Sequence, residues 1–553
     1  MATGASAILD RIKQFSWPSP WMLLTLLLVA IFISPILAVF AAATGDSKDL
    51  WSHLATTVLP RYVGNTLVLA AGVALIALVF GVSSAWLVTR YEFPGRRWLE
   101  WMLLLPAAVP AYIVAYTYTD FLEYAGPVQS LLRDVFGWSS ARDYWFPEIR
   151  SMGGAILVMG AVLYPYVYLM ARTAFLLTPA SLFETAMVAG RDVFWSVALP
   201  LARPAIAAGL ALVLMEALSD FGTVEYFAIE TLTLGIFNVW LGMNNLAAAA
   251  QIACLTFLFI IALLAIEIIA RSRRQFMDTG RRPQPIQARR LVGLQGWSCT
   301  LACLTPVTIG FLIPVGVLLA FILRGYSLSL DAAVVDAIGN SLFVAGTTAM
   351  VVMSTATFMV LICAYRGNAF LRQAAAIASV GYAFPGTILA IGVVTIIGAV
   401  DWVLANAFDS VFGIGRDGVL AGSLVLIILA CSTRFQAIGY GAMTSGQQRL
   451  PPNLVHASRT LGRTFGESLR EVILPLLAKS FIAGGLLVFV DVMKELPMTL
   501  LLRPFNFETL ATYVYQFAKD ELLEEAALPA LVIVLSGIIP VIVMNAALRR
   551  ITR

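Results

Sequence analysis

The segment HASRTLGRTFGESLREVILP, from His456 to Pro475, has a shorter counterpart in ETAMVAGRDVFWSVALP, from Glu184 to Pro200. Both predict a short helix, a glycine, a second helix and a Leu-Pro pair that begins an apolar run. The glycines are Gly190 and Gly462, and glycine permits the left-handed backbone that a sharp bend between two helices needs. A motif that occurs once in each half of a chain indicates an internal duplication.

The composition excludes a water-soluble globular protein. Of the 553 residues, 60% are hydrophobic and 12% are charged, and the mean hydropathy is +0.87, whereas soluble domains are about half apolar. The apolar runs are roughly 20 residues long, which suits membrane-spanning helices and not barrel strands. Two histidines and five scattered cysteines argue against a soft-metal site. We therefore expect an all-α, polytopic membrane protein.

Twelve apolar segments are long enough to be transmembrane helices, six in each half. The candidate spans of the first half are 20–43, 64–89, 98–120, 152–176, 203–223 and 247–270, and those of the second half are 297–323, 340–365, 372–399, 418–440, 477–499 and 527–548. Between them, residues 271–296 read as a basic linker, because Arg271 to Arg290 holds seven arginines and one aspartate. The predicted domains are therefore a first half, 1–270 (core 60–270), and a second half, 297–553 (core 335–548).

The two halves are related by a direct repeat. One and the same offset along the chain separates Asn65 from Asn340, Pro110 from Pro385, and Pro200 from Pro475. An even number of spans in each half gives both halves the same orientation, so they are related by an axis along the membrane normal, where a translocation path is expected. Each asparagine starts the second span of its half, where it can cap the helix.

Acidic residues recur inside the apolar segments at matched positions. Glu216 and Asp220 follow Pro200 at the same two spacings at which Asp491 and Glu495 follow Pro475. Both pairs have the spacing i, i+4, which predicts that the two members of a pair share one helix face. Charges at this depth are costly, so the four carboxylates should face a pathway or one another. Lys494 lies beside the second pair, so an interhelical ion-pair lock is the alternative to a pathway.

The duplicated segment resembles the E-A-A, three residues, Gly, nine residues, Ile-x-Leu-Pro loop of ABC importer permeases, which belong to the binding-protein-dependent transport system inner-membrane components. The resemblance implies a type I importer permease fold, in which this loop docks into the ATPase. The corresponding residues are Glu184, Thr185, Ala186, Gly190 and Pro200 in the first docking loop (Glu184 to Pro200), and His456, Ala457, Ser458, Gly462 and Pro475 in the second (His456 to Pro475). Two departures stand out: His456 replaces the glutamate, and the first loop is three residues short, nearly one helical turn.

Two further stretches resemble the fused, two-domain ferric iron permeases: SDFGTVEYF, residues 219–227, and DVMKELPMTLLLRPFNFETLATYVY, residues 491–515. The resemblance, with the acidic pairs, implies a translocation path for ferric iron. The predicted path residues are Glu216, Asp220, Glu225, Tyr226, Asp491, Lys494 and Glu495, with Glu216, Asp220, Asp491 and Glu495 as transient metal ligands, since hard cations prefer oxygen. A permease for another substrate such as thiamine, and a proton-coupled secondary transporter that uses the carboxylates, remain alternatives.

The expected partners follow from what the sequence lacks. It contains no G-x-x-x-x-G-K-[ST] phosphate loop, so we expect a non-enzymatic subunit that binds no cofactor, with ATP and Mg held by two copies of a separate cytoplasmic ATPase. A periplasmic iron-binding protein should deliver the substrate, and no nucleic acid is involved. Most lysines and arginines fall on the side of the linker, tails and docking loops, which predicts a multi-pass protein of the bacterial inner membrane with both termini in the cytoplasm.

Overall fold

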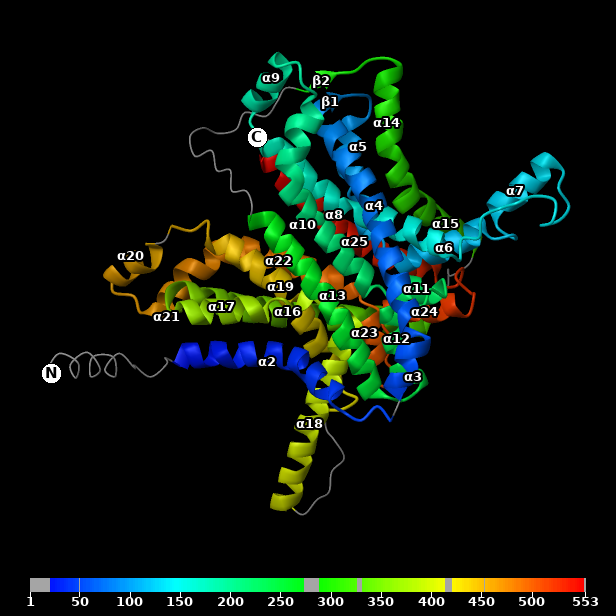
Figure 1. Ribbon diagram of the computed structural model, residues 1–553. Helices are drawn as coiled ribbons and strands as arrows, with labels where there is room; N and C mark the ends of the chain where they lie inside the picture. The colour runs from blue at the N-terminus through cyan, green and yellow to red at the C-terminus, as the bar shows by residue number, and fades with distance from the viewer. Residues whose placement is uncertain are drawn as a thin grey trace.

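The computed structural model describes residues 20–48, 50–272, 288–325, 331–412, 420–451 and 453–551, and these are almost entirely helical (Figure 1). The central part of the linker, residues 273–287, lies outside the described residues. The helices of the first half are α2 (Pro20–Ala43), α3 (Leu50–Thr57), α4 (Leu59–Arg90), α5 (Arg96–Met102), α6 (Ala111–Leu122), α7 (Pro127–Phe136), α8 (Met152–Leu177), α9 (Ala180–Val188), α10 (Leu199–Ser219), α11 (Gly222–Tyr226), α12 (Leu232–Phe237) and α13 (Leu246–Ser272).

The second half follows a similar order, in which α3 and α7 have no counterpart and α21 is added. Its helices are α14 (Leu294–Val307), α15 (Ile313–Leu323), α16 (Ala332–Tyr365), α17 (Ala369–Ala378), α18 (Gly386–Phe412), α19 (Leu424–Gln447), α20 (Leu454–Thr460), α21 (Phe465–Ser468), α22 (Leu474–Met493), α23 (Pro497–Leu502), α24 (Leu510–Lys519) and α25 (Ala527–Ile551). The short 3-10 and π turns between them are η1 (Leu105–Ala108), η2 (Phe194–Ala198), η3 (Asn238–Gly242), η4 (Thr308–Leu312), η5 (Gly381–Ala383) and η6 (Leu469–Ile473). Two short parallel strands, β1 (Tyr91–Glu92) and β2 (Arg289–Arg290), join the end of the linker to the loop after α4.

The described residues include nine helices that are long and apolar enough to cross a membrane, or ten when a bent pair is taken as one span. Helices α13 and α25, with 27 and 25 residues, are also of spanning length. Together these elements overlap the twelve predicted segments. The polytopic all-α fold is therefore confirmed.

Two predicted spans are wrong as single helices. The segment 98–120 is bent by 94° between Arg96–Ala108 and Ala111–Phe136, and the segment 372–399 is divided into α17, η5 and α18. The breaks fall at the equivalent prolines Pro110 and Pro385. Proline supplies no backbone N–H and keeps the preceding residue out of the helical region; Val109 and Phe384 are accordingly extended, with ψ of 123° and 134°.

The repeated asparagines also differ from expectation, because they lie within α4 and α16 and do not cap them. Asn65 donates its amide to the carbonyl of Glu230 at 3.0 Å, and Asn340 donates to the carbonyl of Glu508 at 2.9 Å. The next residue in each half accepts a backbone N–H: Thr66 from Leu232 at 3.0 Å, and Ser341 from Leu510 at 2.7 Å. The repeat therefore fixes the same contact between two helical segments in both halves.

The first membrane helix of each half packs on the other half. Helix α2 lies against α17 and α18, and α14 and α15 lie against α4 and α6 (Figure 1). The approach of α2 is close enough to require a glycine, since a Cβ on Gly392 in α18 would lie 1.9 Å from the carbonyl oxygen of Pro35. This exchange interlocks the halves around a common centre.

Candidate translocation site and docking loops

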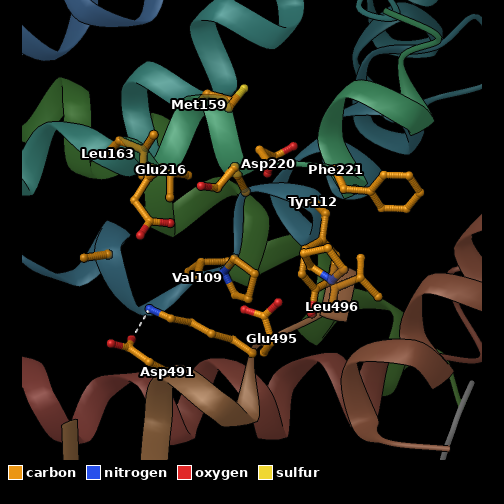
Figure 2. Close-up of a pocket in the computed structure, with 18 of the residues that line it drawn as sticks. Val109, Tyr112, Met159, Leu163, Glu216, Asp220, Phe221, Asp491, Glu495 and Leu496 are labelled. Carbon is orange, nitrogen blue, oxygen red and sulfur yellow. Dashed lines mark ion pairs between the residues drawn. The ribbon is translucent and has the colours of Figure 1, made fainter. Parts of the chain in front are cut away.

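A cavity of about 110 Å³ lies between the two halves, at the point where α10 and α22 end. The first half contributes residues from α6, α8, α10 and α11, and the second half contributes residues from α19, α22 and the turn before α23. Figure 2 shows Glu216 and Asp220 on one side of the cavity and Asp491 and Glu495 on the other. With Lys494, five of the seven predicted path residues line this cavity.

The predicted sharing of one helix face is wrong for both acidic pairs, because each helix ends between its two carboxylates. Helix α10 ends at Ser219 and α22 at Met493. Asp220 then accepts the backbone N–H of Thr223 at 2.9 Å and its hydroxyl at 3.1 Å. Glu495 accepts the backbone N–H of Met498 at 3.2 Å. Each carboxylate thus caps the short helix that follows it, α11 or α23, which turns the chain at the cavity.

Two basic side chains lie among these acids. Lys494 pairs with Asp491 at 2.9 Å (Figure 2). Arg434, from the middle of α19, lies 3.1 Å from Glu495 and 4.0 Å from Glu216. Sequence reasoning missed Arg434, although a single arginine within the apolar segment 418–440 was a visible signal. Among the described lining residues, four carboxylates face two bases, so the cavity has an excess of negative charge.

The four carboxylates share a cavity without forming a metal-binding group in this arrangement. Within the described part of the chain, no three His, Cys, Asp or Glu side chains are placed to hold a metal ion together. Each acid is instead engaged by a base or by backbone N–H groups, as given above. A cation that enters the cavity must therefore compete with Arg434 and Lys494 for its oxygen ligands.

Glu225 and Tyr226 do not line the cavity, and Tyr226 is separated from it by Tyr116 and Tyr112. Tyr226 stacks edge-on against Tyr116 with ring centres 4.4 Å apart, and Tyr116 lies 5.7 Å from Tyr112, which lines the cavity. The guanidinium of Arg150 lies over the Tyr226 ring at 4.9 Å. These three tyrosines form a continuous aromatic column between the cavity and the charged residues around Arg150.

Two ion pairs join the halves around this column. Arg150 of the first half lies 3.1 Å from Glu521 of the second half, and Lys519 of the second half lies 3.5 Å from Glu225 of the first. We call these four residues the outer latch. They tie the two halves together beside the aromatic column.

Both docking loops bend at their glycines as predicted. The φ angle is 65° at Gly190 and 87° at Gly462, both in the left-handed region. The backbone N–H after each glycine returns to the preceding helix: Arg191 to the carbonyl of Ala186 at 2.9 Å, and Arg463 to that of Ser458 at 3.3 Å. This is the hydrogen-bond pattern of a glycine-terminated helix.

The structure also locates the three-residue difference between the loops. In the second loop, Thr464 begins α21 with a capping box that includes Glu467, and η6 follows. In the first loop, Asp192 accepts the N–H of Trp195 at 2.8 Å, and η2 begins at once with Phe194. The first loop therefore lacks the turn that α21 provides, and its bend lies one turn closer to the membrane helix.

The two loops present matching faces. The third residue of each E-A-A equivalent, Ala186 or Ser458, is buried. The first two are exposed in both loops: Glu184 and Thr185, and His456 and Ala457. Beside them, Val188 is 91% exposed and Leu461 is 83% exposed. Each loop therefore presents an accessible apolar side chain beside its bend.

The chain belongs to the family described as the binding-protein-dependent transport system inner membrane component, whose model matches residues 77–275. It is thus a permease of an ABC importer, a transport subunit that works with an ATPase and a binding protein. Over 547 residues it is 24% identical to the Fe(3+)-transport system permease protein FbpB 2 of Haemophilus influenzae, covering 96% of this chain and 98% of that protein.

Other relatives resemble only part of the chain. The sulfate transport system permease protein CysW of Escherichia coli is 30% identical over 265 residues, 45% of this chain and 87% of CysW. The molybdenum transport system permease protein ModB of the same species is 28% identical over 211 residues, 36% of this chain and 89% of ModB.

Proposed function

We propose that this permease forms the translocation path for ferric iron, which a periplasmic iron-binding protein delivers and two copies of a cytoplasmic ATPase drive inward. The observation that carries the proposal is the cavity at the junction of the two halves, with four carboxylates from matched positions and only two bases among its described lining residues. The similarity along nearly the whole chain to a permease named for Fe(3+) transport supports the same substrate.

The charge of the cavity suits ferric iron better than the sulfate and molybdate of the other relatives. Sulfate and molybdate are anions, and an excess of carboxylates in the cavity repels them. A hard trivalent cation, in contrast, prefers the oxygen ligands that carboxylates and tyrosines supply. Tyr112, Tyr166 and Tyr382 also line the cavity, so oxygen donors surround it. The residues at the cavity therefore favour a cation.

The docking loops connect directly to the helices that carry the acids. The first loop continues through η2 into α10, whose last turns bear Glu216. The second continues through α21 and η6 into α22, which bears Asp491 near its end. A movement imposed by an ATPase on either docking helix is transmitted along one helix of about 20 residues, roughly 30 Å, to the cavity. In this proposal both loops and both termini face the cytoplasm of a bacterium, in its inner membrane.

Reconstitution tests the proposal. The permease, with its ATPase in proteoliposomes, is given the iron-loaded binding protein and radioactive Fe(III) is followed. We expect uptake that requires both ATP and the binding protein. ATP-driven uptake of sulfate, molybdate or thiamine with their own binding proteins, and none of iron, would assign another substrate to the same fold.

A further inference from the structure

Arg434 is the one basic side chain of the described cavity lining that contacts acids of both halves. It is 5% exposed, and its two terminal nitrogens point to Glu495 at 3.1 Å and Glu216 at 4.0 Å. Its Nε has no hydrogen-bond partner among the described residues. A buried guanidinium that is incompletely satisfied is costly to keep, so this placement calls for a reason beyond packing.

The position has no basic counterpart among the described cavity residues of the first half. Helix α8 occupies the place of α19 there, and it presents Met159, Val162 and Leu163 to the cavity. Lys494, the other base, pairs within its own segment with Asp491, three residues before it. Of the two bases, only Arg434 therefore draws a carboxylate of each half toward one positive charge, and it does so at the junction of the halves.

We propose that Arg434 is a built-in counter-cation that determines selectivity: it occupies the carboxylates of Glu216 and Glu495 in the empty permease, and only a highly charged cation displaces it. The inference rests on the proposed function, since it treats these carboxylates as ligands of the cargo. Arg434 is thus a specificity residue, and the cargo ion takes over the two carboxylates as the guanidinium leaves them.

The physical basis is competition between a tethered and a free cation. A group held beside its site acts at an effective concentration of millimolar or more, so weakly bound ions lose to it. Attraction to a carboxylate grows in proportion to ionic charge, so a trivalent ion gains about three times the Coulomb energy of a guanidinium at equal distance. The guanidinium carbon already lies 5.7 Å from the Phe435 ring and 5.9 Å from the Tyr382 ring, so two aromatic faces beside it stabilise its charge when the carboxylates bind the cargo ion.

Terbium binding measures this competition directly. Tb(III) is a hard trivalent ion whose luminescence is sensitised by nearby tyrosines, and Tyr112, Tyr166 and Tyr382 line the cavity. The purified complex with its ATPase is titrated as wild type, Arg434→Met and Arg434→Lys. We expect Arg434→Met to bind Tb(III) at least tenfold more tightly than wild type, and Ca(II) to compete with Tb(III) for the site in this variant. The Tb(III) affinity of Arg434→Lys should stay within about threefold of wild type, because lysine keeps the tethered charge.

Arg172→Met is the matched control. Arg172, in α8, is also 5% exposed and pairs with Glu100 at 3.1 Å, but it does not line the cavity. Its replacement should leave Tb(III) affinity unchanged. If Arg434→Met does not fold, Arg434→Gln removes the charge while keeping a hydrogen-bond donor for the carboxylates, and the same tenfold gain is expected. Unchanged or weaker Tb(III) binding in a folded Arg434 variant, or an equal gain in Arg172→Met, overturns the inference.

The outcome is separable from that of the iron proposal. Tighter Tb(III) binding without iron uptake by the wild-type complex would keep Arg434 as a cation competitor and remove iron as cargo. Iron uptake by the wild type, with no change in Tb(III) affinity when Arg434 is replaced, would keep iron as the cargo and remove the competitor role of Arg434.

Discussion

Asp220 has two roles in the cavity, and they can be separated by substitution. Its carboxylate caps α11 through the N–H of Thr223, and it adds negative charge to the cavity lining. Asparagine caps a helix about as well as aspartate, whereas alanine costs about 0.5–2 kcal/mol at such a position. The fold and the charge therefore respond to different replacements.

We predict that Asp220→Asn folds and retains its ATPase but loses most iron uptake, because the amide keeps the cap and removes the charge. Asp220→Ala should lose uptake and also stability, by about 1 kcal/mol. Uptake in proteoliposomes, ATPase co-purification and thermal unfolding are measured in parallel. Full uptake by Asp220→Asn would remove this carboxylate from the pathway.

Lys494 offers a test of the ion-pair lock, with Asp491 as its partner. Both side chains are partly exposed, at 26% and 20%, so stranding Asp491 in Lys494→Met should cost between about 1 kcal/mol, as for an exposed pair, and about 3 kcal/mol, as for a buried one. The double variant Lys494→Met with Asp491→Leu should recover stability. If it also recovers uptake in full, the pair is only a lock; we expect uptake to stay low.

At the level of helices, the docking loops depend on two glycines in left-handed conformation. Neither glycine has an atom within 4 Å of where a Cβ would lie. The free-energy cost of a substitution therefore comes only from holding another residue at a positive φ angle. That cost is about 1–2 kcal/mol for ordinary residues and more for β-branched ones. Gly190, at φ 65°, is close to the region that asparagine tolerates, and Gly462, at φ 87°, is further from it.

We therefore predict that Gly462→Val uncouples ATP hydrolysis from transport or releases the ATPase while the membrane helices stay folded. Gly190→Asn should remain close to wild type. The measurements are ATPase co-purification and the ratio of ATP hydrolysed to substrate moved. Normal coupling in Gly462→Val would contradict the need for this bend.

The sequence predicts the helices better than their interruptions. Composition and run length were enough for the twelve segments, since each must satisfy its own backbone in lipid. Composition and run length did not reveal the breaks at Pro110 and Pro385, although the prolines were visible as a repeat. The residues on both sides of each break are apolar, so hydropathy does not mark the point where the helix turns. The acidic pairs were located correctly, but the helix ends that make Asp220 and Glu495 into caps depend on local hydrogen bonds that spacing alone does not show.

Contacts between distant segments were the hardest to foresee. Arg434 lies 61 residues before Glu495 in the chain, and no periodicity connects them. The outer latch likewise joins Arg150 to Glu521 across 371 residues. Such pairs arise from the packing of the two halves, which a single sequence does not encode in any short motif.

At the scale of the whole molecule, the outer latch holds the two halves together on one side of the cavity. Its ion pairs are solvent-accessible, with Glu521 71% and Lys519 61% exposed, so each contributes about 0.2–1 kcal/mol. We predict that Arg150→Gln with Lys519→Gln raises the ATPase rate without binding protein by a few fold up to about tenfold, as the equilibrium shifts toward opening. Arg142→Gln, which replaces an exposed arginine between α7 and Arg150, is the control. An unchanged ATPase rate in the double variant would show that the latch has no gating role.

The predicted orientation can be checked on the same complex in cells. Ala141 follows α7 on the side of the outer latch, and Gln448 follows α19 on the side of the docking loops; both are exposed. The described native cysteines are buried or half-buried, so labelling of them should be low. A membrane-impermeant thiol reagent added to spheroplasts should label Ala141→Cys and spare Gln448→Cys, and the opposite pattern would invert the topology.

The exchange of first helices between the halves sets an order of events during biosynthesis. Helix α2 begins at Pro20, whereas α18, against which it packs, begins at Gly386 in the other half. Because synthesis adds about 5–20 residues per second, α2 waits in lipid for on the order of tens of seconds with the surface around Pro35 uncovered. The faces of α4 and α6 wait in the same way for α14 and α15. A product that stops at the linker therefore exposes unpartnered surfaces to membrane proteases, and each half matures only when the other has been made.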